Sequence, residues 1–314
     1  MKEIYDTVII GGGPGGYTAA LYAARAGLNT LVLEQLSPGG QMALTHKIDN
    51  YPGFPDGVDG FTLGEDMRRQ AERFGARTRF AQVQAVDLTA QPKVVTTDAG
   101  EFLAKTVILA TGAGPRELGL PGEKELVGRG VSYCAACDGM FYRGKTVAVV
   151  GGGNSAAADA LLLSRIAQKV LLIHRRDTLR ATKIYHERLE STENVVFFWN
   201  SRVTELLREQ KLTGLRLKNT LTGEETEIAC DGVFISIGRK PASGLCREQL
   251  PLDDAGYILA GESTETPIPG VFAAGDVRAK ALRQIVTAAA DGAVAAHQAE
   301  LFLSEGRHFH RPLP

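Results

Sequence analysis

The sequence predicts an α/β protein built from two similar domains, and three observations support this prediction. Its 314 residues suit about two domains of ~100 to 200 residues each. A short β-branched run that ends in three glycines occurs twice, and Gly11 of the first copy lies 140 residues before Gly151 of the second. In each copy an alanine-rich segment and another apolar run follow the glycines. This order of strand, turn, helix and strand predicts a βαβ unit made twice.

The elements of the two units follow from these patterns. The first unit should contain a strand before Gly11, a helix from Pro14 to Ala26 and a strand from Thr30 to Leu33. The second should contain a strand before Gly151, a helix from Asn154 to Ala167 and a strand from Val170 to Ile173.

Further apolar runs complete the expected elements. Residues 107–109 predict a buried strand that enters a glycine turn, and residues 232–237 repeat this pattern before Gly238. Residues 271–273 predict another short strand, and an alanine-rich helix should follow from about Gln284 to Leu303.

If this last strand and helix return to the first domain, the second domain is an insertion. The chain would cross near Gly114–Pro115 and near Lys240–Pro241, where proline beside small or polar residues is typical of linkers. We therefore expect residues 1–113 and 242–314 to form one domain and 114–241 the other. The predicted class is a pair of Rossmann-like domains of the three-layer ββα type, one inserted into the other.

The glycine turns predict two dinucleotide sites. In such a turn the first glycine permits the tight bend, the second lets the backbone approach a pyrophosphate, and a third glycine or an alanine lets the helix pack on the strand. The amides at the helix start then hold the phosphates. These places are filled by Gly11, Gly13 and Gly16 in the first copy and by Gly151, Gly153 and Ala156 in the second.

The residue after the second strand of each unit predicts which dinucleotide it binds. An acid there accepts hydrogen bonds from ribose hydroxyls, whereas a basic group accommodates a 2′-phosphate. The first copy presents Glu34, and the second presents His174, Arg175 and Arg176 with Arg180 close behind. We therefore expect FAD at the first site and NADPH at the second, although a solvated charge run would also explain the arginines.

Asp276 follows the short strand at residues 271–273. A strand end that faces the nucleotide crevice would let this carboxylate bind a ribityl hydroxyl of FAD. The alternative is that Asp276 caps a helix.

Cys134 and Cys137 lie shortly before the second glycine turn. Two cysteines separated by two residues can close a small disulfide ring, and a nearby flavin or nicotinamide could open it again. Half of a zinc site is the alternative, but the second ligand pair is absent and the six histidines form no ligand-spaced cluster, so we expect no metal. Cys230 and Cys246 are expected to be bystanders.

The charge balance argues against a nucleic-acid or membrane partner. Lys and Arg total 35 and Asp and Glu total 36, so no global field draws the protein to either polyanion. The chain starts with Met1 and runs directly into a strand without the apolar stretch of a signal peptide. We therefore expect a cytoplasmic protein.

Over essentially its whole length the chain resembles the low-molecular-weight bacterial thioredoxin reductases. The motifs that carry this resemblance appear in the family's order: Gly11 to Gly16, Glu34 to Gln41, residues 50–53, Ala110 to Gly112, Cys134 to Gly139, His174 to Arg176 with Arg180, and Gly275–Asp276 with Arg283–Gln284.

The resemblance implies a homodimeric flavoenzyme in which NADPH reduces FAD, FAD reduces the Cys134–Cys137 disulfide, and the dithiol reduces thioredoxin or a thioredoxin-like protein. It also implies that Cys137 faces the flavin, that Cys134 attacks the substrate disulfide, and that Asp138 moves protons between the thiols and the flavin. A thiolate is the reactive nucleophile, and a neighbouring carboxylate can accept or return its proton.

The family's cofactor contacts transfer to named positions of this chain. For FAD they are Gly11, Gly13, Pro14, Gly15, Gly16, Glu34, Gln35, Gly39, Gly40, Gln41, Asn50, Val83, Ala110, Thr111, Gly112, Gly275, Asp276, Arg283, Gln284 and Ile285. For NADPH they are Gly151, Gly153, Asn154, Ser155, Ala156, His174, Arg175, Arg176, Arg180, Ile237 and Gly238.

The chain departs from the family in the helix after the second glycine turn. Where two acids are common there, this chain has Ala157, Ala158 and Asp159. The resemblance places such an acid near the nicotinamide, so the efficiency of hydride transfer is open. The resemblance also implies a large rotation of one domain on the other, for which the two linkers supply a hinge.

Other functions would use parts of the same pattern. A related flavoenzyme could take electrons from ferredoxin or reduce another dithiol partner, and a dithiol oxidase could run the disulfide toward oxygen, but such relatives generally lose the basic NADPH cluster. A flavin-dependent ferredoxin–NADP reductase needs no Cys134–Cys137 pair. A non-catalytic nucleotide sensor would gain little from that dithiol.

Overall fold

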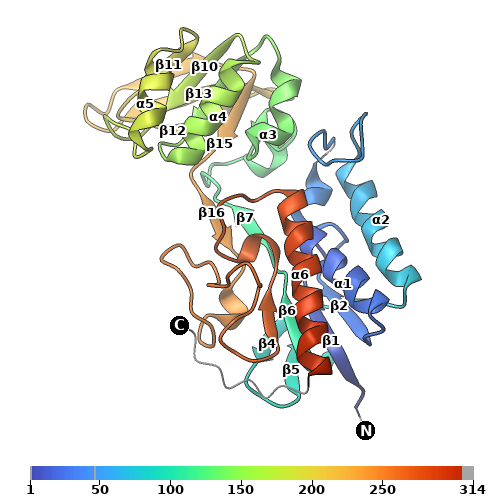
Figure 1. The fold of residues 1–314 in the computed structure, drawn as a ribbon. Coiled ribbons are helices and arrows are strands. Elements are labelled where there is room, and N and C mark those ends of the chain that lie inside the picture. Colours follow the sequence, from blue (N-terminus) through green and yellow to red (C-terminus); the bar gives the residue numbers. More distant parts are fainter. Residues whose placement is uncertain (1, 46, 306–314) are drawn as a thin grey trace. The chain divides into compact units, whose positions relative to one another are not determined.

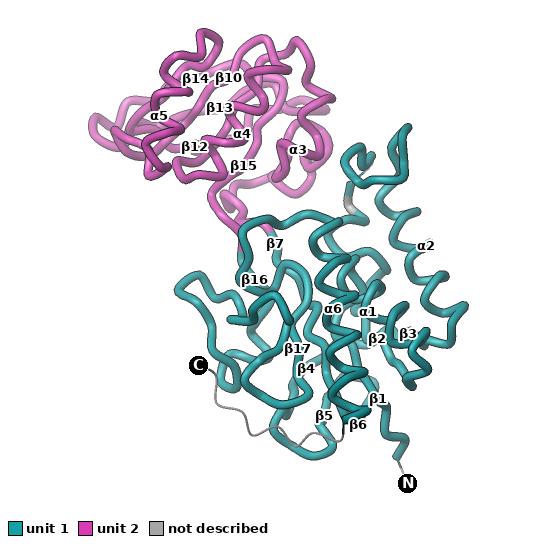
Figure 2. The backbone as a smooth tube through the Cα atoms, in the orientation of Figure 1, with its two compact units in different colours: residues 1–114, 240–314 teal, residues 115–239 magenta. Residues whose placement is uncertain are grey.

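The computed structural model describes residues 2–45 and 47–305. The chain divides into two compact units (Figure 2): Met1–Gly114 with Lys240–Pro314, called the first unit below, and Pro115–Arg239, called the second unit. The chain passes between them twice, in strands β7 (Ala113–Pro115) and β16 (Arg239–Pro241), and these two strands pair with each other.

The first unit contains a seven-stranded sheet in the order β3-β2-β1-β6-β5-β4, with β17 paired to β6 as a side branch. Strands β3, β2, β1, β6 and β17 are parallel, whereas β5 and β4 continue from β6 as an antiparallel meander. Their bounds are β1 Ile4–Ile10, β2 Thr30–Glu34, β3 Arg77–Phe80, β4 Val83–Asp87, β5 Lys93–Thr97, β6 Gly100–Leu109 and β17 Val271–Ala273.

Strand β6 pairs with two different strands along one of its edges. Its first half pairs with β5, its last three residues pair with β17, and its other edge pairs with β1. The meander and β17 therefore both pair with β6, and through this strand the last part of the chain becomes part of the sheet formed by the early part.

Three long helices belong to the first unit: α1 (Pro14–Arg25), α2 (Gly60–Arg73) and α6 (Ile285–Ser304). Helices α1 and α6 lie side by side (Figure 1). They approach so closely that a Cβ on Gly292 would lie 2.1 Å from the backbone oxygen of Gly15. The alanine-rich faces of both helices are therefore explained, since larger side chains would separate them.

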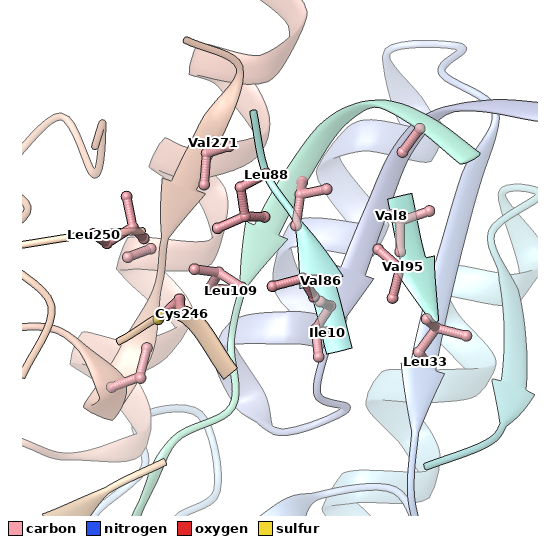
Figure 3. Packing of buried hydrophobic residues seen from close by; sticks show 14 of the residues in the cluster. Val8, Ile10, Leu33, Val86, Leu88, Val95, Leu109, Cys246, Leu250 and Val271 are labelled. Atoms are coloured by element: carbon pink, nitrogen blue, oxygen red, sulfur yellow. The ribbon is translucent and has the colours of Figure 1, made fainter. Parts of the chain in front are cut away.

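The parallel strands of the first unit are covered on both faces. Val8 and Ile10 of β1 pack in one core cluster, with the meander and residues of the last part of the chain such as Leu250 and Val271 (Figure 3). Ile9 points to the other face and packs in a second cluster with alanines of α1 and α6. Because successive side chains of a strand alternate, this division produces three layers: meander, parallel sheet and helices.

The second unit repeats these layers. Its five-stranded parallel sheet has the order β11-β10-β9-β15-β8, and a three-stranded antiparallel sheet has the order β12-β13-β14. Val147 and Val149 of β9 pack toward the helices, whereas Ala148 and Val150 pack toward the antiparallel sheet. The bounds are β8 Val131–Ser132, β9 Thr146–Val150, β10 Lys169–Ile173, β11 Val195–Phe198, β12 Ser201–Arg208, β13 Leu212–Asn219, β14 Glu225–Ala229 and β15 Gly232–Ile235.

The remaining elements are short. The helices of the second unit are α3 (Ala135–Asp138), α4 (Asn154–Ser164) and α5 (Lys183–Glu190). Turns of 3₁₀ helix occupy Gly40–Leu44, Lys124–Leu126, Gly139–Tyr142, Gly244–Cys246 and Gly275–Val277. Among the residues that the structure describes, no helix is both long and apolar enough to cross a lipid bilayer.

The expected elements are present with small shifts at their ends. The expected α/β class with two Rossmann-like units is confirmed. Helix α1 ends one residue earlier than expected and α4 ends at Ser164 rather than Ala167, because residues 165–167 turn back toward β10. The strand expected over residues 232–237 ends at Ile235.

Candidate active site

The first glycine turn is closed by backbone contacts that exclude side chains. Gly11 has φ +107, and a Cβ there would lie 2.4 Å from the backbone oxygen of Ala110. A Cβ on Gly16 would lie 1.8 Å from the backbone oxygen of Gly11. Both positions therefore require glycine, one for the bend and one for the contact between helix α1 and the turn.

Gly13 is different, because a Cβ built on it meets nothing within 4 Å. It precedes α1, whose first residue is Pro14, and no side chain caps the helix start. The amides of this first turn are therefore left for an external anion. The loop at Gly39 and Gly40 lies beside it: the Gly39 amide donates to the Gly12 oxygen at 2.8 Å, and a Cβ on Gly40 would lie 3.4 Å from Gly13 Cα.

Glu34, the last residue of β2, holds this turn. Its Oε2 accepts a hydrogen bond from the Gly12 amide at 2.6 Å, and its Oε1 accepts one from the Gln35 amide at 2.8 Å. The carboxylate is half-buried and retains lone pairs for a further donor. Gln35 and Gln41 are exposed beside it.

The last part of the chain brings a second group of expected residues to the same place. A Cβ on Gly15 would lie 3.5 Å from the Gly275 amide nitrogen. Oδ1 of Asp276 and Nε of Arg283 are buried without a hydrogen-bond partner, although Nζ of Lys280 lies 3.5 Å from that carboxylate oxygen as an ion pair. Such atoms fit a ligand with hydroxyl and carbonyl groups, because a buried polar atom without a hydrogen bond is costly. Asp276 does not cap a helix, since the helix that follows it, α6, has Gln284 at its N-cap.

Residues far apart in sequence also meet at the start of α6. Nδ2 of Asn50 donates to Oε1 of Gln284 at 3.1 Å. Ile285 packs against the small cluster of Met42, Ile48 and Leu63.

The other expected FAD residues are placed by strands. Val83 opens β4 and is half-buried against the meander core. Ala110 is buried after β6, and its amide donates to the Ile10 oxygen. Thr111 and Gly112 follow, and both form hydrogen bonds to Ala242 on the returning chain.

The second glycine turn reproduces the first. Gly151 has φ +151, and its Cβ would lie 2.3 Å from the backbone oxygen of Ser236. A Cβ on Gly153 meets nothing within 4 Å, and no side chain caps the start of α4. Asn154 and Ser155 are exposed on the first turn of that helix, and Ala156 is buried beneath it.

His174 covers the second turn. A Cβ on Gly152 would lie 2.1 Å from Cε1 of the imidazole, and the buried Nε2 has no hydrogen-bond partner. Burial, and then the charges of Arg180 and Arg175, lower the pKa of His174, so the ring is neutral at physiological pH. The orphaned ring nitrogen fits a ligand seated on this turn.

Arg175, Arg176 and Arg180 are all exposed, and no ion pair of the described residues involves them. Three guanidinium groups without a carboxylate fit a phosphate group. Ile237 and Gly238 are exposed after β15, and Gly238 has φ +105.

Asp159 of α4 is half-buried in the second unit. Its Oδ2 accepts a hydrogen bond from the Ser236 hydroxyl at 2.5 Å, and burial raises the pKa of this carboxyl against the effect of that bond. The acid that the chain retains in this helix is therefore held by a residue at the end of β15.

Cys134 and Cys137 form a disulfide with 5.3 Å between their Cα atoms. Cys134 is the N-cap of α3, and its Sγ accepts a hydrogen bond from the Cys137 amide at 3.2 Å. Both residues are partly accessible. The ring is closed within the four residues of the motif, so it can open and close without moving another element.

Two side chains that the sequence did not point out hold this motif. Ser132, buried in β8, donates to Oδ2 of Asp138 at 2.6 Å. Glu123 is buried and accepts from the amides of residues 118–120 and, at 2.7 Å, from the hydroxyl of Tyr133. The only sequence signal for Ser132 was its own place two residues before Cys134.

The other two cysteines are reduced and buried. Burial raises the pKa of Cys230 to about 12 and that of Cys246 to about 11, so neither is a thiolate at physiological pH. Among the described residues no group of three or more His, Cys, Asp or Glu side chains could hold a metal ion.

Comparisons with known proteins place the chain in a family. The model of the pyridine nucleotide-disulphide oxidoreductase family matches residues 5–292. The thioredoxin reductase of Streptomyces clavuligerus is 49% identical over 307 residues, which are 97% of this chain and 95% of that protein. The thioredoxin reductase of Bacillus subtilis is 46% identical, with 97% and 96% covered. The crystal structure of thioredoxin reductase from Streptococcus pyogenes superposes with a TM-score of 0.89 at 44% identity, covering 97% of this chain and 100% of that one.

The chain therefore belongs to the pyridine nucleotide-disulphide oxidoreductase family. The expected class is confirmed: the protein is a flavoprotein disulfide reductase that uses FAD and NADPH. The buried atoms of Asp276 and Arg283 that lack a hydrogen bond, together with the open Gly13, fit the flavin nucleotide. The buried Nε2 of His174 and the exposed arginines fit the phosphorylated nicotinamide nucleotide.

Proposed function

We propose that this enzyme is a thioredoxin-disulfide reductase. The observation that carries the proposal is the Cys134–Cys137 disulfide, closed on α3 in a chain that also has two glycine turns open to dinucleotides. Its relatives named thioredoxin reductase match over nearly the whole chain. Bound FAD would accept hydride from NADPH and pass two electrons to the disulfide.

The glycine turns and basic side chains divide the two cofactors between the units. Glu34 and Asp276 of the first unit would accept hydrogen bonds from the hydroxyls of FAD, and the amides at Gly13 would face its pyrophosphate. Arg175, Arg176 and Arg180 would hold the 2′-phosphate of NADPH, with the neutral ring of His174 beneath. These charges support NADPH as donor over ferredoxin.

The two cysteines would have separate roles. Cys137 would receive the electrons on the flavin side, and Cys134 would attack the disulfide of oxidised thioredoxin, forming a mixed disulfide that Cys137 resolves. Asp138, the last residue of α3, would accept and return the thiol proton. Changing Cys134→Ser and Cys137→Ser separately should abolish thioredoxin reduction in both cases, with flavin reduction by NADPH retained.

An anaerobic titration tests the whole assignment. NADPH should bleach the flavin absorbance of the purified protein, and oxidised thioredoxin added afterwards should restore it. Bleaching by NADPH without recovery on addition of thioredoxin would refute thioredoxin as substrate. A failure of NADPH to bleach the flavin would refute NADPH as donor.

We also propose that the enzyme is a cytoplasmic homodimer. The dimer rests on the resemblance to the low-molecular-weight thioredoxin reductases, and the two buried free thiols are compatible with a reducing compartment. Sedimentation equilibrium should give twice the 33.6 kDa mass of one chain. A monomer across the micromolar range would contradict the dimer, and recovery in a membrane or secreted fraction would contradict the location.

A further inference from the structure

Ser132 occupies a fixed position just before the redox motif. It ends strand β8, where it pairs in parallel register with Phe234 of β15, and its exposed fraction is 3%. The buried strand therefore sets the direction of its side chain, which the partly accessible α3 could not do alone.

The hydroxyl of Ser132 joins three groups of the motif. It accepts a hydrogen bond from the Cys134 amide at 3.1 Å and lies 2.6 Å from Oδ2 of Asp138. It also lies 3.4 Å from the Cys134 backbone oxygen. A serine hydroxyl has one proton to donate. Of its two possible acceptors, the Asp138 carboxylate is closer and charged, so it is a stronger acceptor than the Cys134 backbone oxygen. The proton is therefore directed at Asp138.

Tyr142 lies on the turn after Asp138 and is a titratable neighbour of that carboxylate. Burial and then the charge of Asp138 raise the pKa of Tyr142 to about 12, so this phenol stays neutral and does not compete for the thiol proton. The thiols of Cys134 and Cys137, once reduced, are the other titratable groups of the motif.

We infer that Ser132 is a positioning residue, which holds the Asp138 carboxylate in place to receive the thiol proton. This inference rests on the proposed function. When the dithiol passes two electrons to a substrate disulfide, a Cys134–Cys137 bond forms, two thiol protons leave, and the substrate's S–S bond is replaced by two S–H bonds. Asp138 takes one of the two protons and passes it on, and the substrate thiolates end protonated.

Ser132→Ala in the FAD-loaded enzyme tests the inference. Turnover with thioredoxin should fall on the order of 10-fold, a part of the ~10²- to 10⁴-fold that a positioned acid or base contributes, while KM for thioredoxin stays unchanged. Ser132→Thr keeps the hydroxyl and should restore most of the rate. Ser201→Ala is the matched control, because that serine is also buried in the second unit but its hydroxyl donates to the backbone oxygen of Trp199.

A double variant separates positioning from mere support of the fold. If Ser132 acts through Asp138, Ser132→Ala should cause no further loss in an Asp138→Asn background. A further 10-fold loss there, or an unchanged rate in Ser132→Ala alone, would overturn the inference.

A second assay does not depend on thioredoxin. Dithiothreitol should open the Cys134–Cys137 disulfide of the oxidised enzyme more slowly in Ser132→Ala than in the wild type, as followed by labelling of the released thiols. The same rates in both would overturn the role of Ser132 even if thioredoxin proves to be the wrong substrate. Conversely, a slower opening with no thioredoxin reduction by the wild type would refute the proposed function alone.

Discussion

Arg175 and Arg176 are exposed shortly after β10, next to the position that corresponds to Glu34, the last residue of β2 in the first unit. The carboxylate of Glu34 turns back to accept hydrogen bonds from its own loop, whereas the two guanidinium groups extend into solvent. This difference between otherwise similar units has a measurable consequence for cofactor choice.

Replacing both arginines (Arg175→Ala with Arg176→Ala) should raise KM for NADPH by about 10- to 100-fold. The loss corresponds to one or two charge-assisted hydrogen bonds of about 1.5 to 3 kcal/mol in total. Turnover at saturation and KM for NADH should change little, because NADH lacks the 2′-phosphate. Arg188→Ala, an exposed arginine on α5, is the control. Equal losses with NADPH and NADH would contradict the assignment.

The carboxylate of Glu123 accepts hydrogen bonds from three backbone amides and from the hydroxyl of Tyr133, the residue before Cys134. Glu123→Gln should lower the free energy of unfolding by about 1 to 3 kcal/mol, because an amide group would turn a donor toward those donors. Urea denaturation measures this loss. Glu125→Gln should cost about 1 kcal/mol or less, since that exposed side chain only pairs with Arg208. An equal loss in both variants would contradict the role of Glu123.

At the scale of elements, helix α6 organises the loop that follows β17. Asp291 on α6 accepts hydrogen bonds from the Gly275 amide at 2.9 Å, from Arg278 at 2.6 Å and from Lys280 at 3.0 Å. All three side chains of this network are at most 12% exposed. The helix therefore fixes the loop that presents Asp276, whose Oδ1 lies 3.5 Å from Nζ of Lys280.

Asp291→Asn should lower the free energy of unfolding by about 3 kcal/mol or more at neutral pH, because the buried Arg278 loses its counter-charge and the buried Lys280 keeps only its longer ion pair with Asp276. Burial alone would raise the pKa of Asp291, but Arg278 and Lys280 outweigh it and the net pKa is lowered. The ionised Asp291 carboxylate therefore stabilises the folded state fully at pH values above the pKa of an unfolded aspartate, which is near 3.9. This stabilisation is lost as the pH falls through the lower pKa of Asp291 in the folded state.

The difference in stability between wild type and Asp291→Asn should therefore be full above about pH 5 and should shrink below about pH 4. Urea unfolding at several pH values measures it. The control is Glu300→Gln on the same helix, where the side chain is about half exposed and lies near His297 only at 3.8 Å. A difference that stays constant down to pH 3 would show that charge is not the cause.

At the scale of the whole molecule, the two crossings at β7 and β16 are the only covalent links between the units. If catalysis needs one unit to rotate on the other, restraining these strands should slow it. Flavin binding should not depend on that motion, because the candidate FAD residues all belong to the first unit.

A crosslink tests this expectation. Pro115→Cys in the second unit with Lys240→Cys in the first, joined by a short bismaleimide, should lower turnover while FAD content stays unchanged. The reaction is done on the oxidised enzyme, because the Cys134–Cys137 disulfide does not react and the other two thiols are buried. Each single variant treated with the same reagent is the control. Full turnover in the crosslinked enzyme would reject the hinge.

Much of the site could be predicted because its signals are local. A glycine turn requires particular residues within six positions, and the Cys134–Cys137 ring closes within four, so both are visible in a short stretch of sequence. The short apolar, β-branched runs before the two glycine turns likewise predicted strands, which the structure has as β1 and β9.

Other features depend on contacts between distant residues and left no local signal. Asn50 reaches Gln284, and Asp291 reaches back to the Gly275 amide, only because β17 and α6 return to the first unit. The meander of β4 and β5 and the antiparallel sheet of β12 to β14 were likewise not predicted as elements.

The sequence alone determined the class of fold, the two dinucleotide turns and the redox pair, because backbone geometry and residue spacing dictate each of them over a few residues. Only the tertiary structure decided how those motifs are held: Ser132 under Asp138, Glu123 under Tyr133, and Asp291 beneath the loop of Asp276. Buried polar groups must find partners wherever the packed chain supplies them, and that supply depends on the whole fold rather than on neighbouring residues.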